Sequence, residues 1–193
     1  MIIKGKILPL NRSNIDTDQI IPARHLTGIT KSGYGAHLLE DVPHTTINDP
    51  KYKDAVILLT KENFGSGSSR EHAVWAIMDR GFKAVIAISF ARIFEENCYN
   101  NGLVPVKLKP EEVEILFKET ECEIDVINQN FKTKSGKTFK FDLDPLKKEF
   151  ILKGGFLKFM ESKVDKVKDW EKQHNGCNYA TANAKALPQE YPL

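Results

Sequence analysis

Residues 55–82 read AVILLTKENFGSGSSREHAVWAIMDRGF and carry three structural signals in succession. The unbroken apolar run AVILLT at 55–60 is typical of a strand that is buried on both faces. A loop rich in glycine and serine comes next, and Val74, Ile77 and Met78 then recur at the spacing of one helical face. This stretch therefore predicts a strand, a loop and a helix.

The sequence after this stretch repeats the same alternation. KAVIAIS at 83–89 predicts a second strand, ARIFEENCYNN at 91–101 a second helix and LVPVKL at 103–108 a third strand. Strands that alternate with helices indicate a parallel sheet with crossover connections. FKTKSGKTFKFDLD at 131–144 predicts a hairpin. We therefore expect an α/β fold with a mixed, partly parallel sheet.

Two segments lack periodicity. Residues 23–53 are punctuated by glycine and proline and predict a long loop with at most a short helix, and long ordered loops in compact domains are usually functional. Residues 174–193, HNGCNYATANAKALPQEYPL, predict an extended or disordered tail. The expected organisation is one domain over residues 1–173 and a tail over 174–193.

Composition narrows the classes of function. The chain has 193 residues, of which 41% are hydrophobic and 28% charged, so it can bury a core of its own. Its net charge of +2 balances 28 positive against 26 negative side chains, which does not favour a nucleic-acid or membrane surface. The N-terminal MIIKGKILPL is too short and too interrupted by lysine for a signal peptide, so we expect a cytoplasmic protein.

The three cysteines of the chain are Cys98, Cys122 and Cys177. They are odd in number, far apart and without a CxxC pair, which argues against a disulfide framework and against a zinc or iron–sulfur ligand set. We therefore expect no metal in this chain alone.

The loop before the predicted helix has two interpretations. Ser68 stands three residues before Glu71, which is the spacing of a capping box, and in that interpretation Arg70 is only a surface charge. Alternatively, the exposed amides and the positive end of the helix dipole form an anion site, where the planar fork of Arg70 suits a carboxylate. The same positive potential would stabilise an alkoxide on Ser68 and make it usable as a base.

A phosphate-binding loop is the competing interpretation of this glycine-rich segment. GxxxxGK[ST] is absent, and GSGSSR at 65–70 lacks the third glycine of GxGxxG. Nucleotide binding is therefore disfavoured.

Other polar and aromatic residues have plainer explanations. Asp16 and Asp18 in NIDTD at 14–18 are explained by Asx turns that lead into a helix or strand. Four further residues are assigned to packing or capping rather than to chemistry: His72, Trp75, Phe90 and Cys98.

Three segments together resemble a known family. NIDTDQIIPARHL at 14–26, NFGSGSSREHAVWAI at 63–77 and FARIFEENCYNNGLVPV at 90–106 occur in this order in the small subunit of 3-isopropylmalate dehydratases, the swivelling domain of the aconitase superfamily. The resemblance covers about residues 1–108. It implies a three-layer β/β/α domain.

The resemblance also implies roles for individual residues. Ser68 corresponds to the base that removes a proton from carbon, Arg70 to the residue that holds a substrate carboxylate, and Ser69 to a further hydrogen-bond donor. Relatives often have cysteine where this chain has Ser66, so Ser66 is given no catalytic role.

The segment after NIDTD corresponds to the region where relatives select the side chain of their substrate. Leu26 is there expected to contact an isopropyl group. Arg24 is the nearest candidate for a second carboxylate-binding arginine. In the same comparison, NIDTD lies at the subunit junction and at the rim of the active site.

The reaction implied is the dehydration of 2-isopropylmalate and its rehydration to 3-isopropylmalate in leucine biosynthesis. The implied partner is a large subunit, in a heterodimer or heterotetramer, whose [4Fe-4S] cluster supplies the Lewis acid, so this chain alone is expected to be inactive. Two alternatives stay open: a related hydro-lyase that acts on homoaconitate, citraconate or dimethylmalate, and a phosphate- or nucleotide-binding regulatory module.

Overall fold

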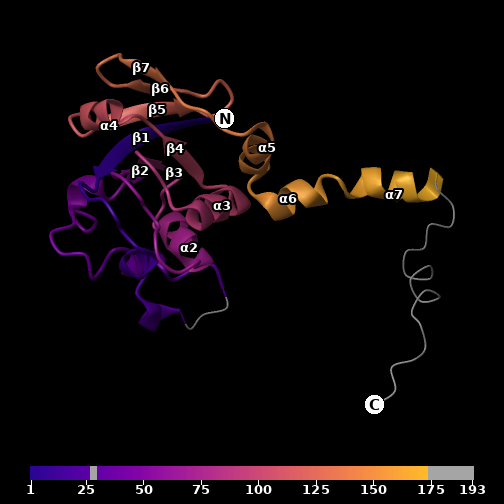
Figure 1. Cartoon of the computed structure of the whole chain (residues 1–193), viewed down its shortest axis with the longest axis horizontal. Helices are drawn as coiled ribbons and strands as arrows, with labels where there is room; N and C mark the ends of the chain where they lie inside the picture. The colour runs from indigo at the N-terminus through magenta and orange to yellow at the C-terminus, as the bar shows by residue number, and fades with distance from the viewer. Residues whose placement is uncertain (27–29, 174–193) are drawn as a thin grey trace. The chain divides into compact units, whose positions relative to one another are not determined.

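The computed structural model describes residues 1–26 and 30–173, and its centre is one seven-stranded sheet (Figure 1). The order of the strands is β4-β3-β2-β1-β5-β6-β7. They are β1 (Ile2–Pro9), β2 (Ala55–Leu59), β3 (Ala84–Ala87), β4 (Val104–Lys107), β5 (Glu121–Asp125), β6 (Asn130–Thr133) and β7 (Thr138–Lys140).

The sheet has a parallel half and an antiparallel half. Strands β1 to β4 pair in parallel, with Leu8 opposite Leu58 and Leu58 opposite Val85. Strand β1 also pairs antiparallel with β5, and β5 to β7 form an antiparallel meander. The predicted mixed sheet is confirmed, and so is the predicted hairpin, which is formed by β6 and β7.

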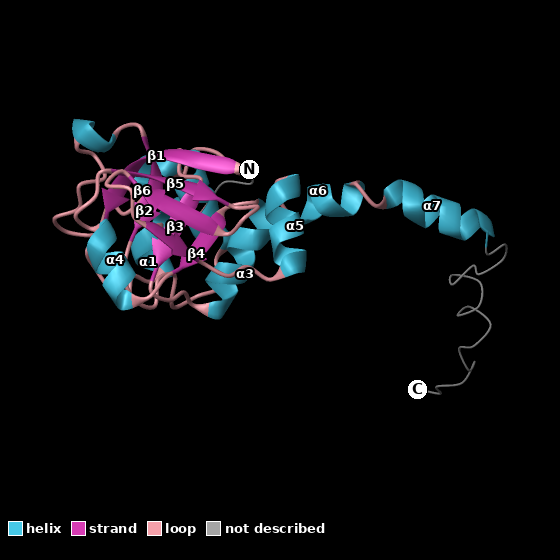
Figure 2. Cartoon of the chain, turned by 90° about the horizontal axis from the view of Figure 1, so that it is seen from above, coloured by secondary structure: helices cyan, strands magenta, loops and turns pink. Residues whose placement is uncertain are grey.

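The helices are α1 (Thr17–Ile20), α2 (Glu71–Asp79), α3 (Arg92–Asn101), α4 (Pro110–Leu116), α5 (Pro145–Lys153), α6 (Phe156–Glu161) and α7 (Val164–Gln173). Helix α2 connects β2 to β3, and α3 connects β3 to β4, so both predicted crossover helices are present. The long connection between β1 and β2 contains α1 and three short 3₁₀ turns, η1 (Ala23–His25), η2 (Gly35–His37) and η3 (Pro50–Tyr52), and it is otherwise loop in the described residues (Figure 2).

Two hydrophobic cores lie on the two faces of the parallel strands. Leu58 of β2 belongs to a core that includes Val74 of α2 and the inner residues of α3. Its neighbour Ile57 belongs to the second core, together with Ile124 of β5 and Phe131 of β6. The sheet therefore curls, so that its antiparallel half covers the face opposite α2 and α3 (Figure 1). This arrangement confirms the expected three layers, β/β/α.

The chain divides into two compact units, Met1–Phe159 and a second unit that begins at Met160. In the second unit, Val164, Val167 and Trp170 recur on one face of α7. No helix among residues 1–26 and 30–173 is long and apolar enough to cross a bilayer. The predicted tail over 174–193 lies outside the described residues, and the predicted boundary at 173 stays a prediction.

Candidate active site

The loop 60–70 lies at the carboxyl end of β2, as predicted, and is tied to the ends of both neighbouring strands. The amide of Gly65 donates to the carbonyl of Ile15 at 2.8 Å, in the segment that follows β1. The amide of Phe64 donates to the carbonyl of Ser89 at 3.1 Å, in the segment that follows β3. Ligands in α/β sheets bind at this edge, because loops from adjacent parallel strands meet there.

Gly65 allows the loop to approach α3 closely. Its φ of +78° lies in the left-handed region, and a Cβ at this position would lie 2.1 Å from the Cγ of Phe94. Phe94 is buried, and its ring meets that of Phe64 edge to face at 5.3 Å. A residue with a side chain would therefore have to displace either the loop or the first turn of α3.

The predicted capping box between Ser68 and Glu71 is wrong. Helix α2 begins at Glu71, and its N-cap is Arg70, which makes no side-chain capping bond. Ser68 lies two residues before that N-cap, too early for its hydroxyl to cap the first turn. Instead, its carbonyl accepts from the hydroxyl of Thr17 at 2.9 Å and from the amide of Arg70 at 2.9 Å.

Glu71, the second residue of the expected capping box, has a different partner. The Oε1 of Glu71 accepts from the Nδ2 of Asn101 at 2.7 Å, so it ties α2 to the end of α3. Within the described residues the hydroxyl of Ser68 forms no side-chain hydrogen bond, and the residue is exposed. Its hydroxyl is therefore available to a ligand.

Ser68, Ser69 and Arg70 line one pocket of about 210 Å³. The first turn of α3 forms the opposite wall. The full lining is Thr17, Gly65, Gly67, Ser68, Ser69, Arg70, Ala91, Arg92, Ile93 and Phe94. Helices α2 and α3 both begin at this pocket, and neither has a side-chain cap, so both present their positive ends to it. The pocket therefore suits an anionic ligand.

The first part of the long connection, which contains α1, contacts this loop. The amide of Thr17 donates to the carbonyl of Ser66 at 2.9 Å, and Asp16 caps α1 by accepting from the amide of Gln19 at 2.7 Å. Asp18 pairs with the guanidinium of Arg70. Asp16 therefore has the capping role expected from its sequence context, whereas Asp18 holds the guanidinium of Arg70, which lines the pocket.

Arg24 and Leu26 do not line this pocket. Arg24 forms a bidentate ion pair with Asp41 at 2.6 and 2.8 Å and also pairs with Glu40. The hydrogen bonds to Asp41 raise the pKa of Arg24 further above its usual range. Leu26 is half-buried and packs against the core. Their expected contacts with substrate are not tested by the structure, and because both residues are engaged within the fold, we assign those contacts to other residues below.

The residues assigned to packing are confirmed in that role. The ring of His72 lies edge to face against Tyr34 at 5.3 Å and is tilted by 57° against Trp75 at 4.6 Å. Phe90 packs against the same core, which contains Cys98. Complete burial raises the pKa of the Cys98 thiol well above its usual value, so this cysteine is not a ready nucleophile.

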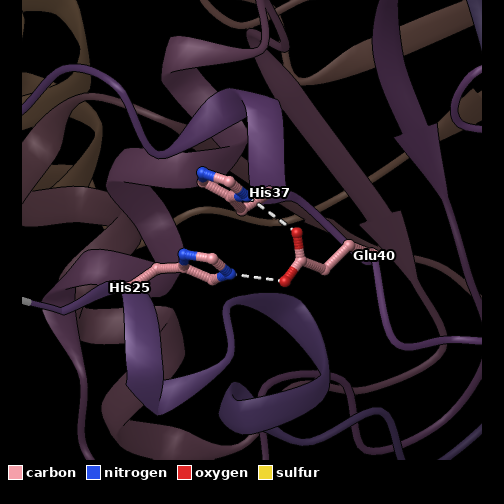
Figure 3. A group of neighbouring side chains, drawn as sticks. All are labelled: His25, His37 and Glu40. Carbon is pink, nitrogen blue, oxygen red and sulfur yellow. Dashed lines mark hydrogen bonds and ion pairs between the residues drawn. The ribbon is translucent and has the colours of Figure 1, made fainter.

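His25, His37 and Glu40 form a separate cluster on the long connection (Figure 3). The Nε2 of His25 lies 2.5 Å from one oxygen of Glu40, and the Nδ1 of His37 lies 2.7 Å from the other. Burial raises the pKa of Glu40, but hydrogen bonds from His37 and then His25 outweigh it, so the net pKa lies below its usual value.

This cluster has the ligand types of a metal site but not the geometry. The rings of His25 and His37 stack with their centroids 3.6 Å apart and only 10° between their planes. A cation shared equally by the two rings would therefore lie about 1.8 Å, half that separation, out of the plane of each ring. Metal–nitrogen bonds of about 2.0–2.1 Å lie along in-plane lone pairs. The rings could hold an ion only after turning, and Arg24 already shares the carboxylate. The cluster is a hydrogen-bonded clasp between η1 and η2.

A hollow elsewhere on the sheet is larger than the pocket at Ser68. It measures about 320 Å³ and lies over β5 and β6. Its charged walls include Lys4, Glu123 and Glu121, which form ion pairs within the sheet, such as Lys4 with Glu123 at 3.3 Å. Because these charges already pair with one another, we favour the smaller pocket at Ser68 as the ligand site, on the chemistry of its lining rather than on its volume.

Five residues of the pocket wall were given no role there by sequence reasoning: Thr17, Ala91, Arg92, Ile93 and Phe94. A signal for the last four was available. In a parallel sheet, the helix that follows the neighbouring strand begins at the same edge as the loop 60–70, which we call the serine loop. The segment ARIF at 91–94 follows the predicted strand 83–89 directly, so its first residues were candidates for the opposite wall.

The fold and this site define a class of protein. The family model of the aconitase C-terminal domain matches residues 1–111, which include β1 to β4, the serine loop and α3. The chain is thus an aconitase-type C-terminal domain.

Individual relatives narrow the class. The 3-isopropylmalate dehydratase small subunit of Neisseria meningitidis serogroup C (strain 053442) is 45% identical over 176 residues, which cover 79% of this chain and 83% of the relative. That of Anoxybacillus flavithermus is 45% identical over 168 residues, covering 80% and 87%. The crystal structure of a 3-isopropylmalate dehydratase from Methanocaldococcus jannaschii superposes with a TM-score of 0.73 at 34% identity, covering 88% and 99%. The chain belongs to the family of 3-isopropylmalate dehydratase small subunits.

Proposed function

We propose that this chain acts as the small subunit of a 3-isopropylmalate dehydratase, a hydro-lyase of leucine biosynthesis. The reaction removes water from 2-isopropylmalate and adds it back to give 3-isopropylmalate. The chain contributes the base and a carboxylate-binding residue, and a large subunit completes the active site.

One observation carries the assignment of residues: Ser68, Ser69 and Arg70 line a single open pocket at the carboxyl end of β2. In the proposed mechanism the Oγ of Ser68 takes the carbon-bound proton, and Arg70 binds a carboxylate through its planar fork. Ser69 donates a further hydrogen bond to the substrate. The positive ends of α2 and α3 stabilise the negative charge that gathers there.

The size of the pocket supports a site shared with a partner. Its volume of about 210 Å³ is below the range of about 300–1,000 Å³ that is usual for small-molecule sites. The walls formed by the loop 60–70 and the first turn of α3 leave the pocket open, with Ser68 and Ser69 exposed. A partner that covers this face would enlarge the site and exclude water from it.

An iron–sulfur cluster does not fit the described part of this chain. Cys98 and Cys122 are both buried, and they belong to the two different cores on opposite faces of the sheet. They cannot converge on one cluster, and burial raises the pKa of Cys122 to about 12. Departure of hydroxide from an unactivated carbon needs a Lewis acid. We assign that cluster to the large subunit.

The engagement of Arg24 favours isopropylmalate over homoaconitate among the related substrates. A tricarboxylate needs an additional cation, and Arg24 is the candidate for it in the segment after NIDTD, where relatives select the side chain of their substrate. Asp41 and Glu40 already neutralise it. A phosphate-binding module is disfavoured because the loop at 65–70 carries neither GxxxxGK[ST] nor a complete GxGxxG.

The test is reconstitution. The chain is purified alone and after co-expression with a large subunit, and the enoic diacid formed from 2-isopropylmalate is followed by its absorbance. We expect turnover only from the assembled enzyme. Turnover or cluster absorbance from the isolated chain would contradict the proposal that the large subunit holds the cluster and is required for turnover. An assembled enzyme that converts homoaconitate but not 2-isopropylmalate would contradict the choice of substrate.

A further inference from the structure

We propose that Arg92 and Ile93 form the second half of the substrate subsite: Arg92 binds a carboxylate of the diacid, and Ile93 contacts its branched alkyl group. The inference rests on the proposed function and extends it to two residues of α3, whereas Ser68 lies on the loop before α2. Both belong to the first turn of α3 (Arg92–Asn101) and line the pocket opposite Ser68, Ser69 and Arg70.

The first turn of α3 is held rigidly against the serine loop. The amide of Ala91, the N-cap, donates to the carbonyl of Phe64 at 3.0 Å. The next anchor is Phe94, which is buried and packs against Phe64 and over Gly65. Arg92 and Ile93 lie between these two anchors, so their backbone positions relative to Ser68 are fixed by the fold. Such placement on a rigid element is what a binding residue requires.

Within the part of the chain that the structure describes, Arg92 differs from the other arginines in having no partner. Arg70 pairs with Asp18 and Arg24 with Asp41, whereas Arg12 and Arg80 donate to backbone carbonyls, which lie in the long connection. Within residues 1–26 and 30–173, no carboxylate or carbonyl accepts from Arg92, which is exposed at the pocket. Two guanidinium groups on opposite walls match the two carboxylates of a diacid.

Ile93 supplies the apolar surface that the pocket otherwise lacks. Its side chain is 46% exposed. Exposure alone means little, since single apolar residues are common on protein surfaces. Here, however, the neighbours on the wall are polar or lack a large side chain, except for the buried Phe94. Leu26, the residue expected from the sequence to contact the isopropyl group, packs against the core instead.

The test uses the enzyme assembled with its large subunit and compares two diacids, 2-isopropylmalate and 2-methylmalate. For Arg92→Gln we expect KM to rise about 10- to 100-fold for both diacids, with partial recovery in Arg92→Lys, since each loses charged hydrogen bonds. For Ile93→Ala we expect KM to rise about tenfold for 2-isopropylmalate and to change little for 2-methylmalate, because only the larger alkyl group loses a contact.

Matched controls are Lys132→Gln on β6 and Ile127→Ala after β5, both exposed residues that lie away from the pocket. Thermal unfolding and gel filtration report folding and assembly of each variant. Unchanged KM values in Arg92→Gln and Ile93→Ala, with Ser68→Ala inactive, would overturn this inference and leave the proposed function intact. Loss of the large subunit from Arg92→Gln would also overturn it, because Arg92 would then be an interface residue. A wild-type enzyme without turnover on either diacid would overturn both.

Discussion

The pocket at the serine loop 60–70 and the cluster of His25, His37 and Glu40 on the long connection both have arginine beside acidic residues, but they use their charges differently. On the connection, Arg24 is held by Asp41 and Glu40, and Glu40 also accepts from two histidines. At the pocket, Arg70 has one exposed acidic partner, and Arg92 has none among the described residues. On the long connection the charges are paired within the fold. At the pocket, Arg70 is held by one exposed carboxylate and Arg92 is unpaired among the described residues, which is why we place the ligand site there.

The largest expected effect comes from Ser68→Ala. A positioned base contributes about 10²–10⁴-fold, so kcat of the assembled enzyme should fall by that factor while KM changes little. The control is Ser66→Ala, one glycine away in the same loop, which should retain near wild-type kcat. Equal activity of the two variants would mean that Ser68 has no chemical role.

Gly65→Ala tests how closely the loop must approach α3. Gly65 and Gly136 both have positive φ, of +78° and +90°, but only at Gly65 would a Cβ meet another residue within 4 Å. We expect Gly136→Ala to cost about 1 kcal/mol from backbone strain and Gly65→Ala about 2–3 kcal/mol or more, because Phe94 must also move. Urea unfolding measures both. Equal losses would show that the contact with Phe94 is not tight.

Glu40→Gln tests the clasp on the long connection. The folded pKa of Glu40 lies below its ordinary value of 4.5, so the carboxylate stabilises the fold above that pH and the contribution disappears as pH falls through the folded pKa. We therefore expect Glu40→Gln to lower Tm at pH 7 by about 2–4 °C or less, and the difference from the wild type to shrink as pH falls below 4.5 through the folded pKa. Asp54→Asn, at an exposed residue before β2, is the control. A Tm difference that stays constant as pH falls, down to the acid unfolding of the wild type, would contradict this assignment.

Much of the architecture was predictable from local patterns. The apolar runs of β2 to β4 and the helical spacing of Val74 and Ile77 are local sequence patterns. They predicted these strands and α2, and the alternation of strands with helices predicted the parallel half of the sheet. The pairing of β1 with β5 was not predictable, because it joins residues more than a hundred positions apart.

The site was predictable only in part, for a similar reason. The serine loop was identifiable from its composition and its resemblance to a family. The capping box failed because spacing alone does not say where a helix begins: α2 starts at Glu71, so Ser68 lies outside the capping position. The ion pair of Arg24 with Asp41 and the position of Arg92 in the pocket wall both depend on tertiary contacts between segments that are separate in the sequence.

The measurement that tests the comparison most directly is KM for 2-isopropylmalate in assembled enzymes carrying Arg70→Gln or Arg24→Gln. Loss of a charged bidentate contact costs about 1.5–3 kcal/mol, so Arg70→Gln should raise KM by about 10- to 100-fold. Arg24→Gln should leave KM within about twofold of the wild type, because its charge is already neutralised within the fold. The reverse result, a large increase for Arg24→Gln and none for Arg70→Gln, would contradict the account and move the carboxylate site to the long connection.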